Sequence, residues 1–386
     1  MKSLLRNNRR FNSRMFQSYS QIESTMRTIR FYFIFGIIVL TCSCSKSYSP
    51  SSEDVVLDPA ILNTALELNV EKETTLSNLG GVEAAYVYED SIIITHNRGR
   101  QEEGFIKVFD KNFNLIKELF REGNGKDELI SALVSWNGSS LIVNDFIKGQ
   151  IANVDLDKLL SDKQYIPSII TYQDKLVFTV CVEDDSTLVM ANPFYFHDEK
   201  TGIQQGDRRL IRTTPDKSEI ASVKYPFNTF NVSGQGFLIP SPSRDTYLYA
   251  SRSESAVEVY NKDLSLQKTI YGPKTIAADY RTEPVPQNDT QEVLYQNQHL
   301  EAYTSCCSDS EHAYFLYYGN LFTPGEEEAG SETYILQYDW DGSLSNCYVT
   351  KLMLRTISKG RGEHVFYGSL LDDEGEVHLV KLNTGE

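Results

Sequence analysis

The stretch that decides the fold reads Ile106-Lys-Val-Phe-Asp-Lys-Asn-Phe-Asn-Leu-Ile-Lys-Glu-Leu119, and it recurs as Val257-Glu-Val-Tyr-Asn-Lys-Asp-Leu-Ser-Leu-Gln-Lys-Thr-Ile270. Both copies consist of an alternating apolar run, a polar turn and a second alternating run. Alternation with a period of two is typical of β-strands, and Asn and Asp are typical of tight turns. Each copy therefore predicts two antiparallel strands joined by a hairpin.

Further copies of this unit lie along the chain. A third spans Ile335 to Leu344, and weaker ones start at Ile151, near Leu210 and at Val377. The intervals between the six starts are about 45, 59, 47, 78 and 42 residues, close to the length of a four-stranded propeller blade. The sequence predicts an all-β fold over 59–386, a six-bladed β-propeller of four-stranded blades.

Two features of the ring follow from the spacing. The longest interval contains Thr282 to His299, rich in Gln, Asn and Pro, which we predict to be an excursion on one face. The last copy, Val377 to Asn383, ends near the C-terminus, so its blade lacks an outer strand. We expect Ala65 to Glu71 to pair with Val377 to Leu382, because this would close the ring and remove two exposed sheet edges.

The N-terminal region has the pattern of a bacterial lipoprotein signal peptide over 26–43. Arg27 and Arg30 precede the apolar run Phe31 to Leu40, which is too short to span a bilayer, and the small residue Ser43 precedes Cys44. We predict lipidation at Cys44. A cleaved secretory signal without lipid is the alternative, and Cys42 is a weaker lipidation candidate because it follows a threonine.

The remaining boundaries follow from this signal. Residues 1–25 precede a better-placed methionine and are interpreted as a gene-model extension, and 44–58 as a solvated tether rich in Ser, Pro and acidic residues. Ser45 replaces the aspartate that commonly retains lipoproteins in the inner membrane, so we expect an outer-membrane lipoprotein of the cell envelope. Its facing, inward or outward, stays open.

The charge balance limits the partners. Removing 1–43 takes away seven Lys/Arg and one Glu, which leaves 30 basic and 52 acidic residues and a net charge of 30 − 52 = −22. Such a surface repels phosphates, so we expect no nucleic-acid binding and no adhesion to anionic lipid. The predicted partners are the lipid bilayer, through acylated Cys44, and an envelope protein or glycan.

Motifs that suggest chemistry have simpler explanations. Asp110, Asn112 and Asn114 begin like a calcium loop, but the glycine and glutamate that such a loop requires are missing. Asp339-Trp-Asp341-Gly342 is typical of a hairpin turn, and Gly123 and Gly125 lack the residues of a phosphate-binding loop. The sequence predicts no catalytic, cofactor-binding or metal-binding residues and no cofactor.

Histidines and cysteines are scattered. The histidines show no spacing that pairs two metal ligands; they are residues 96, 197, 299, 312, 364 and 378. We expect Cys181, Cys306, Cys307 and Cys347 to be buried free thiols, with a bridge from Cys347 to one of the adjacent pair as the alternative in an oxidising compartment.

Four segments together resemble the TolB-like six-bladed β-propeller lipoproteins of Bacteroidetes: Cys44-Ser-Lys-Ser, Phe105 to Leu129, Tyr314 to Asn320 and Ile335 to Gly342. The family's Gly-x-Gly-Pro-Gly-Glu pattern appears as Gly123-Asn-Gly-Lys-Asp-Glu128, without its proline. The resemblance implies a propeller in the envelope that binds a protein or ligand, and it brings no catalytic residues. The alternative is a hydrolase or lyase with a site at the central channel.

Replacing Cys44 by Ala should move the protein from the membrane to the soluble fraction, because the acyl chains are the predicted anchor. Fractionation of cells followed by immunoblotting measures this. Cys42→Ala serves as the control and should leave the protein in the membrane. Membrane association of the Cys44→Ala variant would contradict the prediction.

Overall fold

A computed structural model describes residues 54–385 except 77–78, 80–81, 90, 97–103, 138, 146, 173–178, 185–186, 192–196, 199–201, 204–207, 215–218, 225–229, 232–235, 253, 275–279, 286–287, 297–298, 323–331 and 373. The predicted signal peptide and Cys44 lie outside these residues. Within them, no helix combines the length and the apolar character needed to cross a bilayer.

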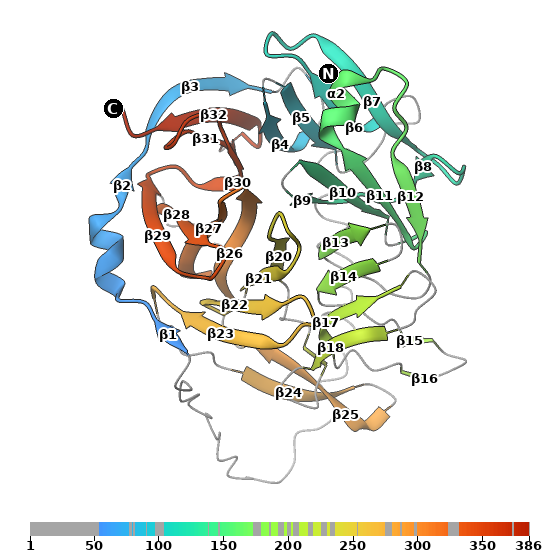
Figure 1. The fold of residues 1–386 in the computed structure, drawn as a ribbon, viewed down its shortest axis with the longest axis vertical. Coiled ribbons are helices and arrows are strands. Elements are labelled where there is room, and N and C mark those ends of the chain that lie inside the picture. The colour runs from blue at the N-terminus through green and yellow to red at the C-terminus, as the bar shows by residue number, and fades with distance from the viewer. Residues whose placement is uncertain are drawn as a thin grey trace, which may run out of the picture. The chain divides into compact units, whose positions relative to one another are not determined.

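The described strands form six blades arranged in a ring (Figure 1). Blade 1 contains β4 (Val82–Tyr88), β5 (Ser91–His96), β6 (Gly104–Phe109), β7 (Leu115–Glu122) and the short β8 (Glu128–Leu129). Blade 2 contains β9 (Leu133–Asn137), β10 (Ser140–Asp145), β11 (Gln150–Asp155) and β12 (Ser168–Thr171). Blade 3 contains β13 (Thr179–Asp184), β14 (Thr187–Ala191), β17 (Arg208–Thr213) and β18 (Glu219–Lys224).

The other three blades each include a piece of the N-terminal segment. Blade 4 contains β20 (Gly236–Pro240), β21 (Thr246–Ser251), β22 (Ala256–Asn261), β23 (Leu266–Tyr271) and β1 (Val55–Val56). Blade 5 contains β26 (His299–Ser308), β27 (His312–Phe322), β28 (Thr333–Asp339), β29 (Leu344–Thr350) and β2 (Leu66–Glu67). Blade 6 contains β30 (Leu354–Lys359), β31 (Phe366–Leu371), β32 (Val377–Asn383) and β3 (Asn69–Thr75).

The six sequence repeats begin at the third strand of each blade, which confirms the predicted six-bladed propeller, although blades 1, 4 and 5 have a short fifth strand beyond the four predicted. These strands are β6, β11, β17, β22, β28 and β32. The turn after β6 explains the repeated Asp/Asn pattern, because the Asp110 carboxylate accepts hydrogen bonds from the backbone N–H of Asn112 and Asn114 and from the Asn114 side chain, each at 2.8 Å. The carboxylate oxygens are thus engaged in the turn.

The ring closes at blade 6 as predicted, but with a different segment. β3 pairs with β32 from Asn69 opposite Asn383 to Thr75 opposite His378, so only the end of the predicted Ala65–Glu71 segment takes part. Leu66 and Glu67 instead form β2, which pairs in parallel with β29 of blade 5. The physical reason lies in two buried leucines that bracket β3, Leu68 and Leu76, since their burial fixes the register.

The segment before β3 runs along the outer edges of blades 4 and 5 (Figure 1). β1 pairs with β23, and a 3-10 helix, η1 (Pro59–Thr64), leads on to β2. We call residues 54–76 the N-terminal belt. The belt pairs with the ring from Val55 onward. The C-terminal end of the predicted 44–58 tether is therefore part of the belt.

Several smaller elements lie outside the six blades. The predicted excursion contains a hairpin of β24 (Tyr280–Val285) and β25 (Asn288–Gln296), and β25 pairs with β19 (Phe230–Asn231). A second hairpin joins β15 (His197–Asp198) to β16 (Gly202–Ile203), and a short helix, α2 (Leu156–Ser161), follows β11.

The blades pack through aromatic and aliphatic side chains. Eight of the largest fully buried side chains are tyrosines: Tyr247, Tyr249, Tyr260, Tyr303, Tyr314, Tyr317, Tyr338 and Tyr348. The four described cysteines are buried and free, as expected. Between blades 3 and 4, buried Arg209 lies 2.9 Å from Glu258, so even the charged groups at this junction are paired.

A histidine links the closing strand to blade 6. His378 Nδ1 lies 2.7 Å from Glu73 of β3, and its Nε2 lies 2.8 Å from Asp372. The hydrogen bond to Asp372 and the negative charges of Asp372 and Glu73 raise the pKa of His378 above 6.5, although desolvation opposes them. The imidazolium is therefore favoured in the folded state.

Because the pKa is higher in the folded protein, this link stabilises the fold fully below about pH 6.5 and is lost as the pH rises through the folded pKa. His378→Gln should destabilise the protein at pH 6 and change its stability less at pH 9, as measured by urea unfolding. Lys381→Gln is the control, because the Lys381–Glu71 pair, 2.8 Å apart on the same two strands, keeps its charges over this range. Equal losses at both pH values for His378→Gln would refute the role of the histidine.

Candidate functional site at the channel mouth

The innermost strands run in the same direction and give the ring two unlike faces. Contacts such as that of Val87 N–H with Ser358 Oγ, 3.0 Å apart, align the late parts of β4 and β30. We call the face at which the innermost strands begin the amino face and the opposite one the carboxy face. The strands β14, β18 and β23 end at the amino face, whereas the carboxy face carries short turns such as 309–311.

Four charged residues lie on the amino face, close to where the innermost strands begin. Glu83 is the second residue of β4 and Arg355 the second of β30, while Glu301 lies near the start of β26 and Arg252 follows β21. Arg252 Nη2 and Glu301 Oε1 are 2.6 Å apart. The positive charge of Arg355 acts to lower the pKa of Glu83, and the charges of Glu301, Arg355 and Arg252 all act on the pKa of Tyr318 in β27. We call these four residues the mouth cluster.

Burial changes the pKa of one acid of this cluster, Glu83. Desolvation raises the pKa of Glu83 above 4.5, and the positive charge of Arg355 only partly offsets it. Arg355 itself is exposed. A partly desolvated carboxyl beside an accessible guanidinium is an arrangement that can bind a polar ligand through directed, charge-assisted hydrogen bonds.

The mouth cluster contains two carboxyls and two guanidiniums, with the phenol of Tyr318 nearby, and it contributes no serine, cysteine or histidine side chain. Burial raises the pKa of Tyr318 to about 12, so its phenol is protonated near neutral pH. Among the described residues, no group of three or more His, Cys, Asp or Glu side chains has the arrangement to hold a metal ion.

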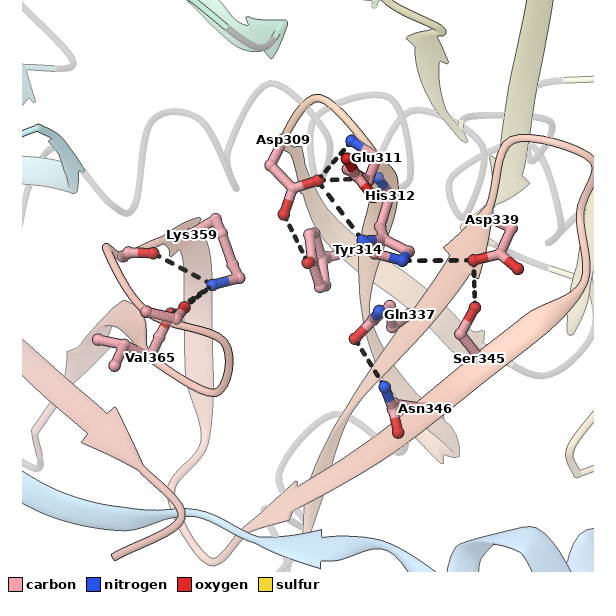
Figure 2. A network of polar contacts seen from close by, with 12 residues as sticks. Asp309, Glu311, His312, Tyr314, Gln337, Asp339, Ser345, Asn346, Lys359 and Val365 are labelled. Atoms are coloured by element: carbon pink, nitrogen blue, oxygen red, sulfur yellow. Dashed lines mark hydrogen bonds and ion pairs between the residues drawn. The ribbon is translucent and has the colours of Figure 1, made fainter. Parts of the chain in front are cut away.

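The polar network of the carboxy face, between blades 5 and 6, has a different character (Figure 2). Asp309 accepts hydrogen bonds from the backbone N–H of Glu311 and His312 and from the Tyr314 hydroxyl, at 2.7–2.8 Å. His312 lies between Asp309 and Asp339, 3.6 and 3.4 Å away. These groups tie the turn between β26 and β27 to blade 5.

Lys359 of the same face holds the loop that follows β30 (Figure 2). Its ammonium donates to the carbonyls of Gly360, Gly362 and Val365 and lies over the ring of Phe366. Burial lowers its pKa, but all three N–H donors have acceptors. We therefore assign Lys359 a structural role in place of a nucleophilic one.

The residues considered in the sequence analysis do not converge. His312 and His364 lie near the carboxy face in blades 5 and 6, His378 lies in the closing strand pair, and the side chains of residues 96, 197 and 299 lie outside the described part. The mouth cluster was not predicted. No motif marks it, because its members come from four separate places in the sequence. Glu83, Glu301 and Arg355 lie near the start of an innermost strand, and this position is the signal that could have located them.

Among known proteins, the chain is similar only to solved structures. No protein-family model matches the sequence, and no curated protein matches it. Among solved structures, a protein from Bacteroides fragilis that is described as exported matches with a TM-score of 0.50 and 10% identity over 85% of this chain and 98% of its own. A DUF4221 family member from Bacteroides vulgatus matches with a TM-score of 0.44 and 9% identity over 82% and 97%, and a streptogramin B lyase with 0.40 and 11% over 82% and 98%. At such identities the likeness concerns the fold alone. The chain is a β-propeller.

The electrostatics of the mouth cluster can be measured directly. We expect the Glu83 carboxyl to titrate above pH 4.5, and Arg355→Gln to raise its pKa further, because the variant removes the cation that stabilises the carboxylate. Carboxyl ¹³C NMR of glutamate-labelled protein, with Glu83→Gln for assignment, gives both values. A Glu83 pKa that stays the same in Arg355→Gln would show that the two groups do not interact.

Proposed function

We propose that this protein is a lipid-anchored β-propeller of the bacterial cell envelope, similar to the TolB-like lipoproteins, that captures a ligand or partner protein at its amino face. The observation that carries the proposal is the mouth cluster, in which charges of both signs from four places in the sequence meet on a rigid ring. Acylation of Cys44 would hold the ring at the outer membrane.

Several properties support binding as the activity. The cluster offers an acceptor in Glu83 and a donor in Arg355, fixed to innermost strands that the neighbouring blades hold in place. Preorganised groups bind with a smaller entropic cost than mobile ones. A net charge of −22 for the mature chain favours an envelope protein or a glycan over nucleic acid.

One observation favours a second function, a hydrolase or lyase sited at the channel. Glu83, with its raised pKa, has the property of a general acid. Such an enzyme also needs a nucleophile, a base or a metal to act with it, and the described part of the mouth cluster supplies only Glu301 as a further carboxyl. We therefore place binding first.

The test is cross-linking in intact cells, followed by purification of the tagged protein and identification of what comes with it. We expect a reproducible envelope partner, lost in Arg355→Glu and on deletion of 282–299. Lys163→Glu makes the same charge change on an exposed position between α2 and β12 and should retain the partner.

The variants must keep the melting temperature of the wild type, so that loss of the partner reports on the surface. Capture that is the same in Arg355→Glu would exclude the mouth cluster as the binding site. Turnover of an envelope glycan by the purified protein, abolished in Glu83→Gln, would instead establish the enzyme.

A further inference from the structure

A cavity opens at the junction of blades 6 and 1, where the ring closes. Its floor is apolar and includes the buried residues Val87, Ile92 and Leu379, and its rim carries Lys72, Lys111 and Lys381. Two aromatic rings, Phe113 and Tyr367, also line it. We call it the junction cavity. It lies toward the carboxy face, since it includes residues of the turns after β4 and β6, and is thus distinct from the mouth cluster.

Some charged side chains that line the junction cavity have an ion-pair partner and others do not, among the described residues. Lys381 pairs with Glu71 at 2.8 Å, and Glu89 on the rim forms an ion pair with Arg361. For Lys72 and Lys111, in contrast, the described residues provide no ion-pair partner. Asp110 adjoins Lys111 in sequence, but its carboxylate accepts the hydrogen bonds of the turn. Two cations are therefore available to an anionic ligand.

The backbone fixes where these groups lie. Lys72 and Thr74 are alternate residues of β3 and both line the junction cavity, while Glu73 between them contacts His378 on the other side. Lys111 and Phe113 belong to the turn that Asp110 holds, in which Phe113 has a positive φ of 62°. The cations and one aromatic ring thus sit on a hydrogen-bonded strand and a hydrogen-bonded turn.

From this arrangement we propose that the junction cavity binds an acidic sugar, a hexuronate residue of a saccharide. Lys72 and Lys111 pair with its carboxylate, and the less polar face of the pyranose packs on the Phe113 and Tyr367 walls. Inorganic phosphate could use the lysines but has no apolar face to cover the floor. The predominantly acidic surface raises the selectivity, because it repels anions that lack these specific contacts.

The ligand can be tested with defined probes. D-galacturonic acid and its trimer are titrated into the purified mature protein by calorimetry, with D-galactose as the neutral control. We expect saturable binding of the uronates that weakens with added salt. Lys72→Gln and Lys111→Gln should each raise the Kd about three- to tenfold, in line with loss of one hydrogen bond from a solvent-exposed side chain, whereas Lys111→Arg should retain most of the affinity. Lys163→Gln, an exposed lysine elsewhere, should change nothing.

Several results would overturn the proposal: no saturable uronate binding, equal binding of galactose, equal binding of inorganic phosphate, or an unchanged Kd in both lysine variants. The outcome is independent of the function proposed above. Loss of uronate binding in Lys72→Gln or Lys111→Gln leaves the cross-linking result at the amino face unaffected, and failure of that capture leaves the calorimetry unaffected.

Discussion

The pairing of β3 with β32 is the interaction on which the rest of the structure depends. A six-bladed ring that ended with β32 would leave blade 6 with three strands and an unpaired edge, which invites pairing with other chains. The N-terminal belt supplies the fourth strand from the far end of the sequence. Because this pairing joins residues some three hundred positions apart, it fixes the ring in one circular arrangement, and the positions of both candidate binding regions follow from it.

The polar side chains on the two faces of the ring have different surroundings. On the carboxy face the polar groups of blades 5 and 6 are committed to turns and loops, as the Asp309 and Lys359 contacts show. The amino face carries the charged residues Glu83, Arg252, Glu301 and Arg355 of the mouth cluster. The same strands thus present groups committed to turns at one end and a cluster of charges at the other, because the two ends of each strand have different surroundings.

The sequence predicts those parts of the fold that residues close together in the chain determine. The six third strands were found because a polar turn and two alternating runs are encoded within about 15 residues. The closing strand was placed four residues too early, because alternation alone does not show that Leu68 and Leu76 anchor its ends. Glu83 and Arg355 became neighbours only through the closure of the ring. The same is true of Lys72 and Lys111 in the junction cavity, so residue spacing alone could not predict either candidate binding region.

The N-terminal belt also has a mechanical consequence. Under the proposed lipid anchor, a pull on the protein away from the membrane first loads β1, which makes only a two-residue pairing with β23. β1, η1 and β2 would separate from the ring one after another before the force reached the longer pairing of β3 with β32. Releasing residues 54–68 adds roughly 50 Å of extended chain, at about 3.4 Å per residue. The belt would thus serve as an extensible linker, which increases the distance that the ring can reach from the membrane while the pairing of β3 with β32 stays intact.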